Sequence, residues 1–115
     1  MSTATFSAIK VPSAANLREH WRTRAARSKA QRRDGNIMGL LCKEPLPVIV
    51  TLTRVAPRSL DSDNLQSAFK SFRDGIADAH GVNDKDEKVI KFEYAQRKGK
   101  PGECAVECKI ERMAK

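Results

Sequence analysis

The sequence contains no long apolar run, and this absence argues against a membrane-spanning protein. A helix needs about 20 consecutive apolar residues to cross a bilayer. The longest clean apolar run here covers only residues 46–52 and contains Pro47. Residues 1–6 also lack the charged start and the apolar stretch of a secretory signal peptide. We therefore expect a cytoplasmic protein with no membrane partner.

Cysteine and histidine are too few and too scattered to predict a zinc site. The three cysteines, Cys42, Cys104 and Cys108, contain no C-x-x-C pair, and His20 and His80 lie far from them along the chain. Structural zinc sites need four such ligands at short, regular spacings. We expect the cysteines to be buried, reduced thiols and the two histidines to be surface residues rather than ligands.

The sequence also lacks repeats, low-complexity segments and linkers. Its 115 residues, 40% of them hydrophobic, suit one small domain over residues 1–115. Positive charge is abundant, because 22 lysines and arginines against 14 acidic residues give a net charge of +8. A basic surface favours polyanionic partners such as nucleic acid. Residues 61–87 differ, since they hold seven acidic side chains and three basic ones. Such a segment repels a polyanion unless it holds a divalent cation against a phosphate.

Hydrophobic periodicity predicts two main helices and four strands. Gly35 is expected to break or bend the first helix, and residues 98–102 are expected to form a hairpin-like loop. The predicted order is a strand over 5–11, a helix over 15–33 that resumes over 37–41, a strand over 48–55, a helix over 63–80, and strands over 89–96 and 104–110.

One apolar stripe of the second helix is spaced for packing on a sheet. It consists of Leu65, Phe69, Phe72, Ile76 and Ala79. The simplest fold that buries every such stripe is α+β, a mixed four-stranded sheet with two main helices packed on one face.

Asp61 and Asp63 flank a single residue just before the second predicted helix. In an extended segment, this spacing points both carboxylates to the same side. Close carboxylates repel each other unless a cation neutralises them, and their oxygen atoms suit a hard divalent ion such as Mg²⁺. A third carboxylate from the turn after the helix, Asp84 or Asp86, would complete a metal site.

The same acidic residues also have a purely structural interpretation. Asp63 would cap the helix, with Gln66 as the second half of a capping box. Asp74 and Asp78 would then form a solvated face. The arginine-rich first helix is likewise compatible with ordinary solvated surface. The local pattern alone leaves both interpretations open.

With its flanking residues, the acidic pattern resembles a known family. Asp61-Ser62-Asp63-Asn64-Leu65, followed by Lys70, Asp74 and Gly81-Val82-Asn83-Asp84, resembles the signature of the RusA family of Holliday junction resolvases. The resemblance covers roughly residues 5–112. It implies a compact α+β fold of the RusA type and a homodimeric endonuclease that depends on Mg²⁺ or Mn²⁺. Such enzymes, often encoded by prophages, nick two strands symmetrically at four-way DNA junctions.

The resemblance also implies which residues bind the metal ion. Asp61 and Asp63 match the family's paired aspartates, and Asp84 matches its third aspartate. The family often has Asp-Asp where this chain has Asn83-Asp84, and Asp86 lies close enough to be a rival.

The family's functional lysine is matched less directly. The family spacing falls on Ser67, and Lys70 lies nearly one helical turn later, on the same face as Asp63. The resemblance therefore implies four catalytic candidates, Asp61, Asp63, Asp84 and Lys70.

Basic residues near the two ends of the chain are the candidates for contacting the DNA backbone. They are Arg18, Arg22, Arg27, Lys29, Lys98 and Lys100. Two other functions stay open from the sequence. One is a non-catalytic basic protein that binds nucleic acid, in which the acidic loop is structural. The other is a nuclease of the same fold that acts on flaps or replication forks.

Overall fold

The computed structural model describes residues 2–7 and 21–113. Parts of the first predicted strand and of the first predicted helix lie outside these residues. In chain order, the elements are β1 (Ser2–Ser7), α1 (Trp21–Leu41), β2 (Val48–Ala56), α2 (Ser62–Ala68), α3 (Lys70–His80), β3 (Ile90–Lys98) and β4 (Ala105–Arg112). Within this described part, no helix is both long enough and apolar enough to cross a membrane.

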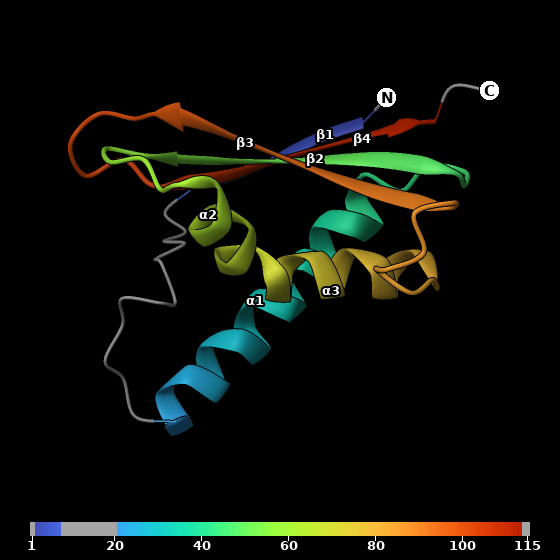
Figure 1. Cartoon of the computed structure of the whole chain (residues 1–115), viewed down its shortest axis with the longest axis horizontal. Coiled ribbons are helices and arrows are strands. Elements are labelled where there is room, and N and C mark those ends of the chain that lie inside the picture. Colours follow the sequence, from blue (N-terminus) through green and yellow to red (C-terminus); the bar gives the residue numbers. More distant parts are fainter. Residues whose placement is uncertain (1, 8–20, 114–115) are drawn as a thin grey trace.

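Strands β2, β3 and β4 form a mixed sheet, and β1 extends it by pairing with β4 (Figure 1). The strand order is β1-β4-β2-β3, with β2 and β3 parallel and the other pairs antiparallel. All three described helices lie on one face of the sheet (Figure 1). The predicted α+β class is therefore confirmed, and β3 forms one edge of the sheet.

Buried and half-buried residues alternate along most of β2, as expected for a strand with one face packed against helices. Val48, Val50 and Leu52 are fully buried, and the residues between them are half-buried. Val50 pairs in register with Phe92 of β3 and Ile110 of β4. These apolar side chains line up across the strands and form the sheet side of the core.

The second predicted helix is two helices, α2 and α3, joined at Phe69. The backbone N–H of Phe69 is shared between the carbonyl oxygens of Leu65 (3.3 Å) and Gln66 (3.2 Å), which tightens the chain at that point. A single helix over 63–80 was therefore a wrong prediction. The predicted apolar stripe is confirmed, because all five of its members are buried; they are Leu65, Phe69, Phe72, Ile76 and Ala79.

Helices α1 and α3 cross at glycines that allow their backbones to touch. A methyl group at Gly35 would overlap the backbone of Phe72, and one at Gly75 would lie 2.6 Å from the backbone nitrogen of Asn36. Gly35 lies inside the continuous helix α1, so the predicted break there is wrong. Its role is steric, because no larger residue fits at this crossing.

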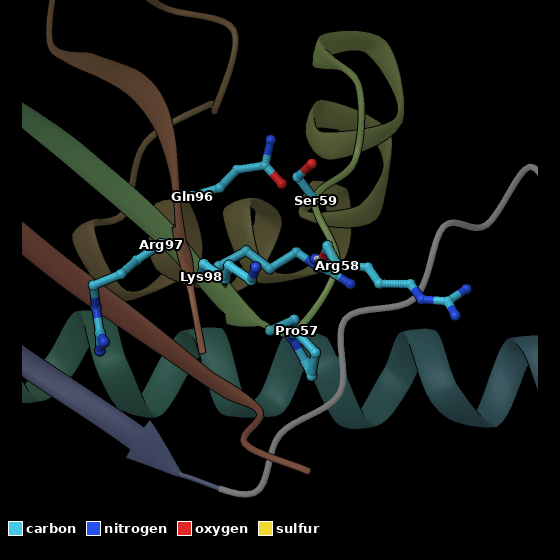
Figure 2. Close-up of a pocket in the computed structure, with 8 residues that line it drawn as sticks. Pro57, Arg58, Ser59, Gln96, Arg97 and Lys98 are labelled. Carbon is cyan, nitrogen blue, oxygen red and sulfur yellow. Dashed lines mark hydrogen bonds between the residues drawn. The ribbon is translucent and has the colours of Figure 1, made fainter. Parts of the chain in front are cut away.

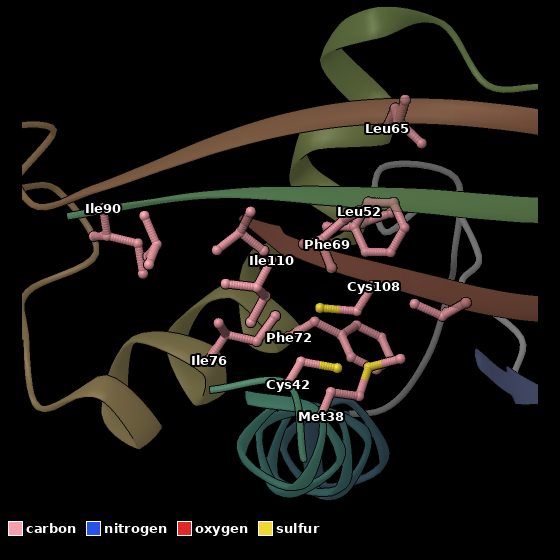
Figure 3. Close-up of a cluster of buried hydrophobic side chains, with 14 residues drawn as sticks. Met38, Cys42, Leu52, Leu65, Phe69, Phe72, Ile76, Ile90, Cys108 and Ile110 are labelled. Atoms are coloured by element: carbon pink, nitrogen blue, oxygen red, sulfur yellow. The ribbon is translucent and has the colours of Figure 1, made fainter. Parts of the chain in front are cut away.

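The core gathers between the sheet and the helices, as Figure 3 shows. Cys42 and Cys108 are buried within it, and Cys104 is only half-buried just before β4. All three cysteines are free thiols. The prediction of buried, reduced thiols is therefore correct for two of them and wrong for Cys104.

Residues 98–102 do not connect a hairpin. Strands β3 and β4 are separated by β2 in the sheet, so the segment between them crosses the end of β2. The N–H of Gly99 donates to the carbonyl oxygen of Ala56 at 2.9 Å, which fixes the crossing. The predicted hairpin is wrong because local spacing cannot show that a third strand intervenes.

Candidate nucleic-acid groove and acidic site

Asp61 sits at the start of α2 and caps it. Its backbone is extended (φ −70°, ψ 168°), and its Oδ1 accepts the N–H of Asn64 at 3.0 Å. The predicted cap at Asp63, with Gln66 as its capping-box partner, is therefore wrong by two residues. Asp63 lies in the first turn of α2 and is exposed. Its negative charge suits the positive end of the helix dipole.

A glutamine on β3 holds the loop that carries Asp61. Gln96 Nε2 donates to the carbonyl oxygen of Leu60 at 2.6 Å, and Gln96 Oε1 accepts the Leu60 N–H at 2.8 Å. This paired contact fixes the backbone next to Asp61 against the sheet edge. No local sequence pattern predicts this contact, because Gln96 and Leu60 lie 36 residues apart in the chain.

Asp84 takes part in an ion pair. Arg73 Nε lies 3.0 Å from Asp84 Oδ2, and Arg73 Nη2 donates to the Asp84 carbonyl oxygen at 2.8 Å. Arg73 Nη1 also donates to the hydroxyl of Tyr94 at 3.1 Å, and the guanidinium lies 4.8 Å from the ring centre of Phe92. Arg73 thus joins α3, the turn after it and β3. No local sequence pattern predicts this role of Arg73.

Asp86 is exposed on the same turn as Asp84. Its Oδ1 accepts the N–H of Lys88 at 3.3 Å, and its own N–H donates to the carbonyl oxygen of Asn83 at 3.0 Å. Asp86 therefore stabilises the turn. Within the described residues, its hydrogen bonds do not reach Asp61 or Asp63.

Asp74 and Asp78 are not simply a solvated face. Arg32 of α1 donates to Asp78 through Nε at 2.8 Å, so this pair ties α1 to α3. Asp74 is half-buried, and burial, followed by the nearby charge of Asp84, raises the pKa of its carboxyl group. His80, predicted at the surface, is buried, and its Nδ1 lies 2.9 Å from the carbonyl oxygen of Ile76.

The prediction of an extended segment that points Asp61 and Asp63 to the same side is wrong, because Asp63 lies inside α2, but both carboxylates keep oxygen atoms free for a ligand. Only one oxygen of Asp61 is used by the cap, and Asp63 makes no hydrogen bond or ion pair within the described part of the chain. In that part, no three His, Cys, Asp or Glu side chains are grouped to hold a metal ion by themselves. Mg²⁺ in nucleotide-processing sites commonly takes one or two carboxylates and completes its shell with water and substrate phosphates. A site that used Asp61 and Asp63 would be of that kind and not a three-carboxylate cage.

A basic pocket of about 470 Å³ lies where β2 and β3 end. Figure 2 shows its lining, with Gln96, Arg97 and Lys98 of β3 beside Pro57, Arg58 and Ser59 of the loop after β2. Arg54 also lines it and donates to the Arg58 carbonyl oxygen at 2.6 Å; burial lowers the pKa of its guanidinium. The pocket leads directly to the loop that carries Asp61.

Two further pockets lie along β3, and each shares lining residues with its neighbour. The middle one, of about 580 Å³, shares Gln96 with the basic pocket and is also lined by Ser62, Leu65, Gln66, Glu93, Tyr94 and Ala95. The third, of about 260 Å³, shares Gln66 and Tyr94 with the middle one. Its other lining residues are Ser67, Lys70, Arg73, Asp84 and Lys85. We call the three pockets together the β3 groove.

The β3 groove brings some of the predicted site residues together. Lys70 and Asp84 line its third pocket, as does Ser67, the position that the family spacing assigns to lysine. Asp61 and Asp63 do not line that pocket. They flank Ser62, which lines the middle pocket.

The predicted DNA contacts are distributed more widely. Lys98 lines the basic pocket, and Lys100 is exposed in the loop that follows. Lys29 is exposed on α1, where Arg27 is half-buried and has an interaction partner. Arg18 and the side chain of Arg22 lie outside what the structure describes.

No protein-family model matches this chain, and a search of curated proteins likewise finds no match. Any function proposed for this chain therefore rests on its sequence pattern and on the geometry of the β3 groove.

Proposed function

We propose that this chain is a metal-dependent endodeoxyribonuclease that resolves four-way DNA junctions by paired, symmetric nicks, in DNA recombination and repair. One observation carries the proposal. Asp61 and Asp63 are the sequence neighbours of Ser62, which lines the middle of a groove whose two end pockets are lined by basic side chains, although neither aspartate lines any of the three pockets itself. This arrangement suits a nucleic-acid backbone that passes an acidic pair, and the resemblance to RusA resolvases names the same pair.

Charge explains why a cation belongs in this proposal. Two exposed carboxylates repel a phosphate that approaches along the basic groove, and a divalent ion between them removes that repulsion. Mg²⁺ or Mn²⁺, when bound, would neutralise the phosphate and activate a water molecule for hydrolysis of the phosphodiester. Asp61 and Asp63 are the residues that would hold it.

Lys70 and Asp84 are assigned to the third pocket of the groove. The Lys70 ammonium is exposed there and would contact a phosphate oxygen, which stabilises negative charge that develops during hydrolysis. Asp84 is engaged with Arg73 through Oδ2, and no three carboxylates are grouped in the described residues, so the proposed metal site uses Asp61 and Asp63 without Asp84 or Asp86 as a third ligand.

The decisive experiment separates the metal role of Asp61 from its capping role. Asparagine caps a helix about as well as aspartate, so Asp61→Asn should keep the urea midpoint of the wild type. Cleavage of a labelled four-way junction with Mg²⁺ or Mn²⁺ should fall by about 100-fold or more in both Asp61→Asn and Asp63→Asn. Junction binding in EDTA should be retained or become tighter, because a repulsive charge is removed.

A linear duplex of the same sequence serves as the substrate control. Cleavage that both variants retain would contradict the assignment of the pair. Cleavage of flaps or forks in preference to the four-way junction would show that flaps or forks are the substrate.

The structure favours one alternative function by a specific observation. Asp61 caps α2 and Asp84 holds Arg73, so both aspartates have structural roles that need no metal. A non-catalytic DNA-binding protein would use them in this way only. It would bind the junction, never cut it with either metal, and be unaffected by Asp61→Asn.

A further inference from the structure

Four cations at the two ends of the β3 groove form no ion pair within the described residues, although Lys70 lies near enough to Asp74 for its charge to lower the pKa of that carboxyl group. Arg58 and Lys98 line the basic pocket, and Lys70 and Lys85 line the third pocket. Arg97, by contrast, forms an ion pair with Glu107 at 3.5 Å. Unpaired cations that share one groove favour an anionic ligand.

The separation of the two cationic ends requires an extended ligand. Tyr94 lines the third pocket and lies four residues from Lys98 along β3, which is about 13 Å of strand. A single phosphate cannot span that distance. The ligand that fits carries several negative charges along a chain.

The residues that line the middle of the groove suit a nucleic-acid base as ligand and not a phosphate. Gln66 offers an amide there, whereas the amide of Gln96 is engaged with the Leu60 backbone, and the exposed carboxylate of Glu93 repels phosphate. The Tyr94 ring lines both the middle and the third pocket. It is held in place by the Arg73 hydrogen bond and stacks on Phe69, with ring centres 6.1 Å apart and planes 24° apart. A fixed aromatic ring between cationic ends is the arrangement on which unpaired bases stack.

We infer that the β3 groove binds one unpaired DNA strand, with phosphates on Arg58 and Lys98 at one end and on Lys70 and Lys85 at the other, and a base against Tyr94. A duplex does not fit this description, because its bases are already stacked on each other. The inference deepens the proposed function and rests on it for the identity of the nucleic acid. It places the strand beside Ser62, the residue that separates Asp61 from Asp63 in the sequence.

Binding in EDTA tests the inference without hydrolysis. The probe is a labelled oligothymidylate of about 10 nucleotides, followed by fluorescence anisotropy over a series of salt concentrations. The variants Arg58→Ala/Lys98→Ala and Lys70→Ala/Lys85→Ala should each raise Kd about tenfold or more. Each should also reduce the slope of log K against log salt by about 1.4, which corresponds to two lost phosphate contacts on a single strand.

The matched control is Lys43→Ala/Lys91→Ala, which removes two exposed lysines that line none of the three pockets. Glu93→Gln should tighten binding. Tyr94→Phe should keep the affinity, and Tyr94→Leu should lose about tenfold, with urea midpoints measured to verify folding.

The results separate the inference from the proposed function. If the groove variants bind like the control, or if duplex binds more tightly than the single strand, the inference is overturned even when the junction is cut. If the strand binds in the groove as described but the junction is never cut, the inference stands and the nuclease proposal is overturned.

Discussion

Arg73 links three parts of the protein through one guanidinium group. It pairs with Asp84, donates to Tyr94 and lies over the ring of Phe92. Both side chains of the Arg73–Asp84 pair are half-buried, so removing one of them leaves the other partly shielded from water without its partner. A loss of cleavage in Asp84→Asn would therefore have a structural cause. Asp61→Asn is the more informative substitution, because asparagine keeps the cap.

Cys108 gives a prediction for the pH dependence of stability. Burial, followed by the nearby Cys42 thiol, raises the pKa of Cys108 to about 12, above the ordinary cysteine pKa of about 8.5. The folded protein keeps this proton while the unfolded chain releases it, so stability is full below about pH 8.5 and falls as pH rises. The expected fall is at most about 1.4 kcal/mol per pH unit.

Urea unfolding from pH 7 to 10 measures this dependence, with Cys108→Ala as the comparison. The variant loses stability at every pH because of its cavity, but its loss above pH 8.5 should be shallower than that of the wild type. Equal slopes would show that Cys108 is not held protonated by the fold.

Among the secondary-structure elements, α1 and α3 can cross closely because glycine residues lie at their contact. Gly75→Ala places a methyl group against the carbonyl of Arg32 and 2.6 Å from the Asn36 nitrogen, both backbone atoms that cannot rotate away. We expect a loss of about 3 kcal/mol in the free energy of unfolding, even though alanine favours a helix over glycine.

Gly81→Ala is the matched control for that substitution. Gly81 ends α3 with φ of 67° and has open space around it, so its replacement costs only the strain of the left-handed backbone, about 1 to 2 kcal/mol. Urea midpoints of the two variants compare a steric cost with a conformational one. A smaller loss for Gly75→Ala than for Gly81→Ala would contradict close packing at the crossing.

At the scale of the whole molecule, one chain carries one Asp61–Asp63 pair, and paired nicks need two such pairs. A two-fold symmetric dimer meets this need and matches a nearly symmetric four-way junction. We expect sedimentation with a labelled junction to show two chains per junction. Mixtures of wild-type and Asp63→Asn chains should convert a cruciform plasmid mainly to nicked circles, whereas wild type alone should produce linear molecules. A complex with one chain per junction would contradict the proposed dimer.

The features that depend on short-range periodicity were predicted correctly from the sequence. Strand β2 was predicted to within one residue, and the apolar stripe from Leu65 to Ala79 was predicted in full. Both follow from the spacing of side chains on a strand or a helix. The exposed acidic pair was also visible, because a charged D-x-D before a helix is a local pattern.

The way in which distant segments meet could be seen only in the folded chain. The tertiary structure placed β2 between β3 and β4, which excludes the predicted hairpin, and it gave Gly35 a steric role at a helix crossing. It also brought Gln96 to the loop before Asp61, and Lys70 and Lys85 to the groove along β3. These contacts join residues that are far apart in the chain or lie on different elements. Their energies depend on packing in three dimensions, which no local spacing of residues records.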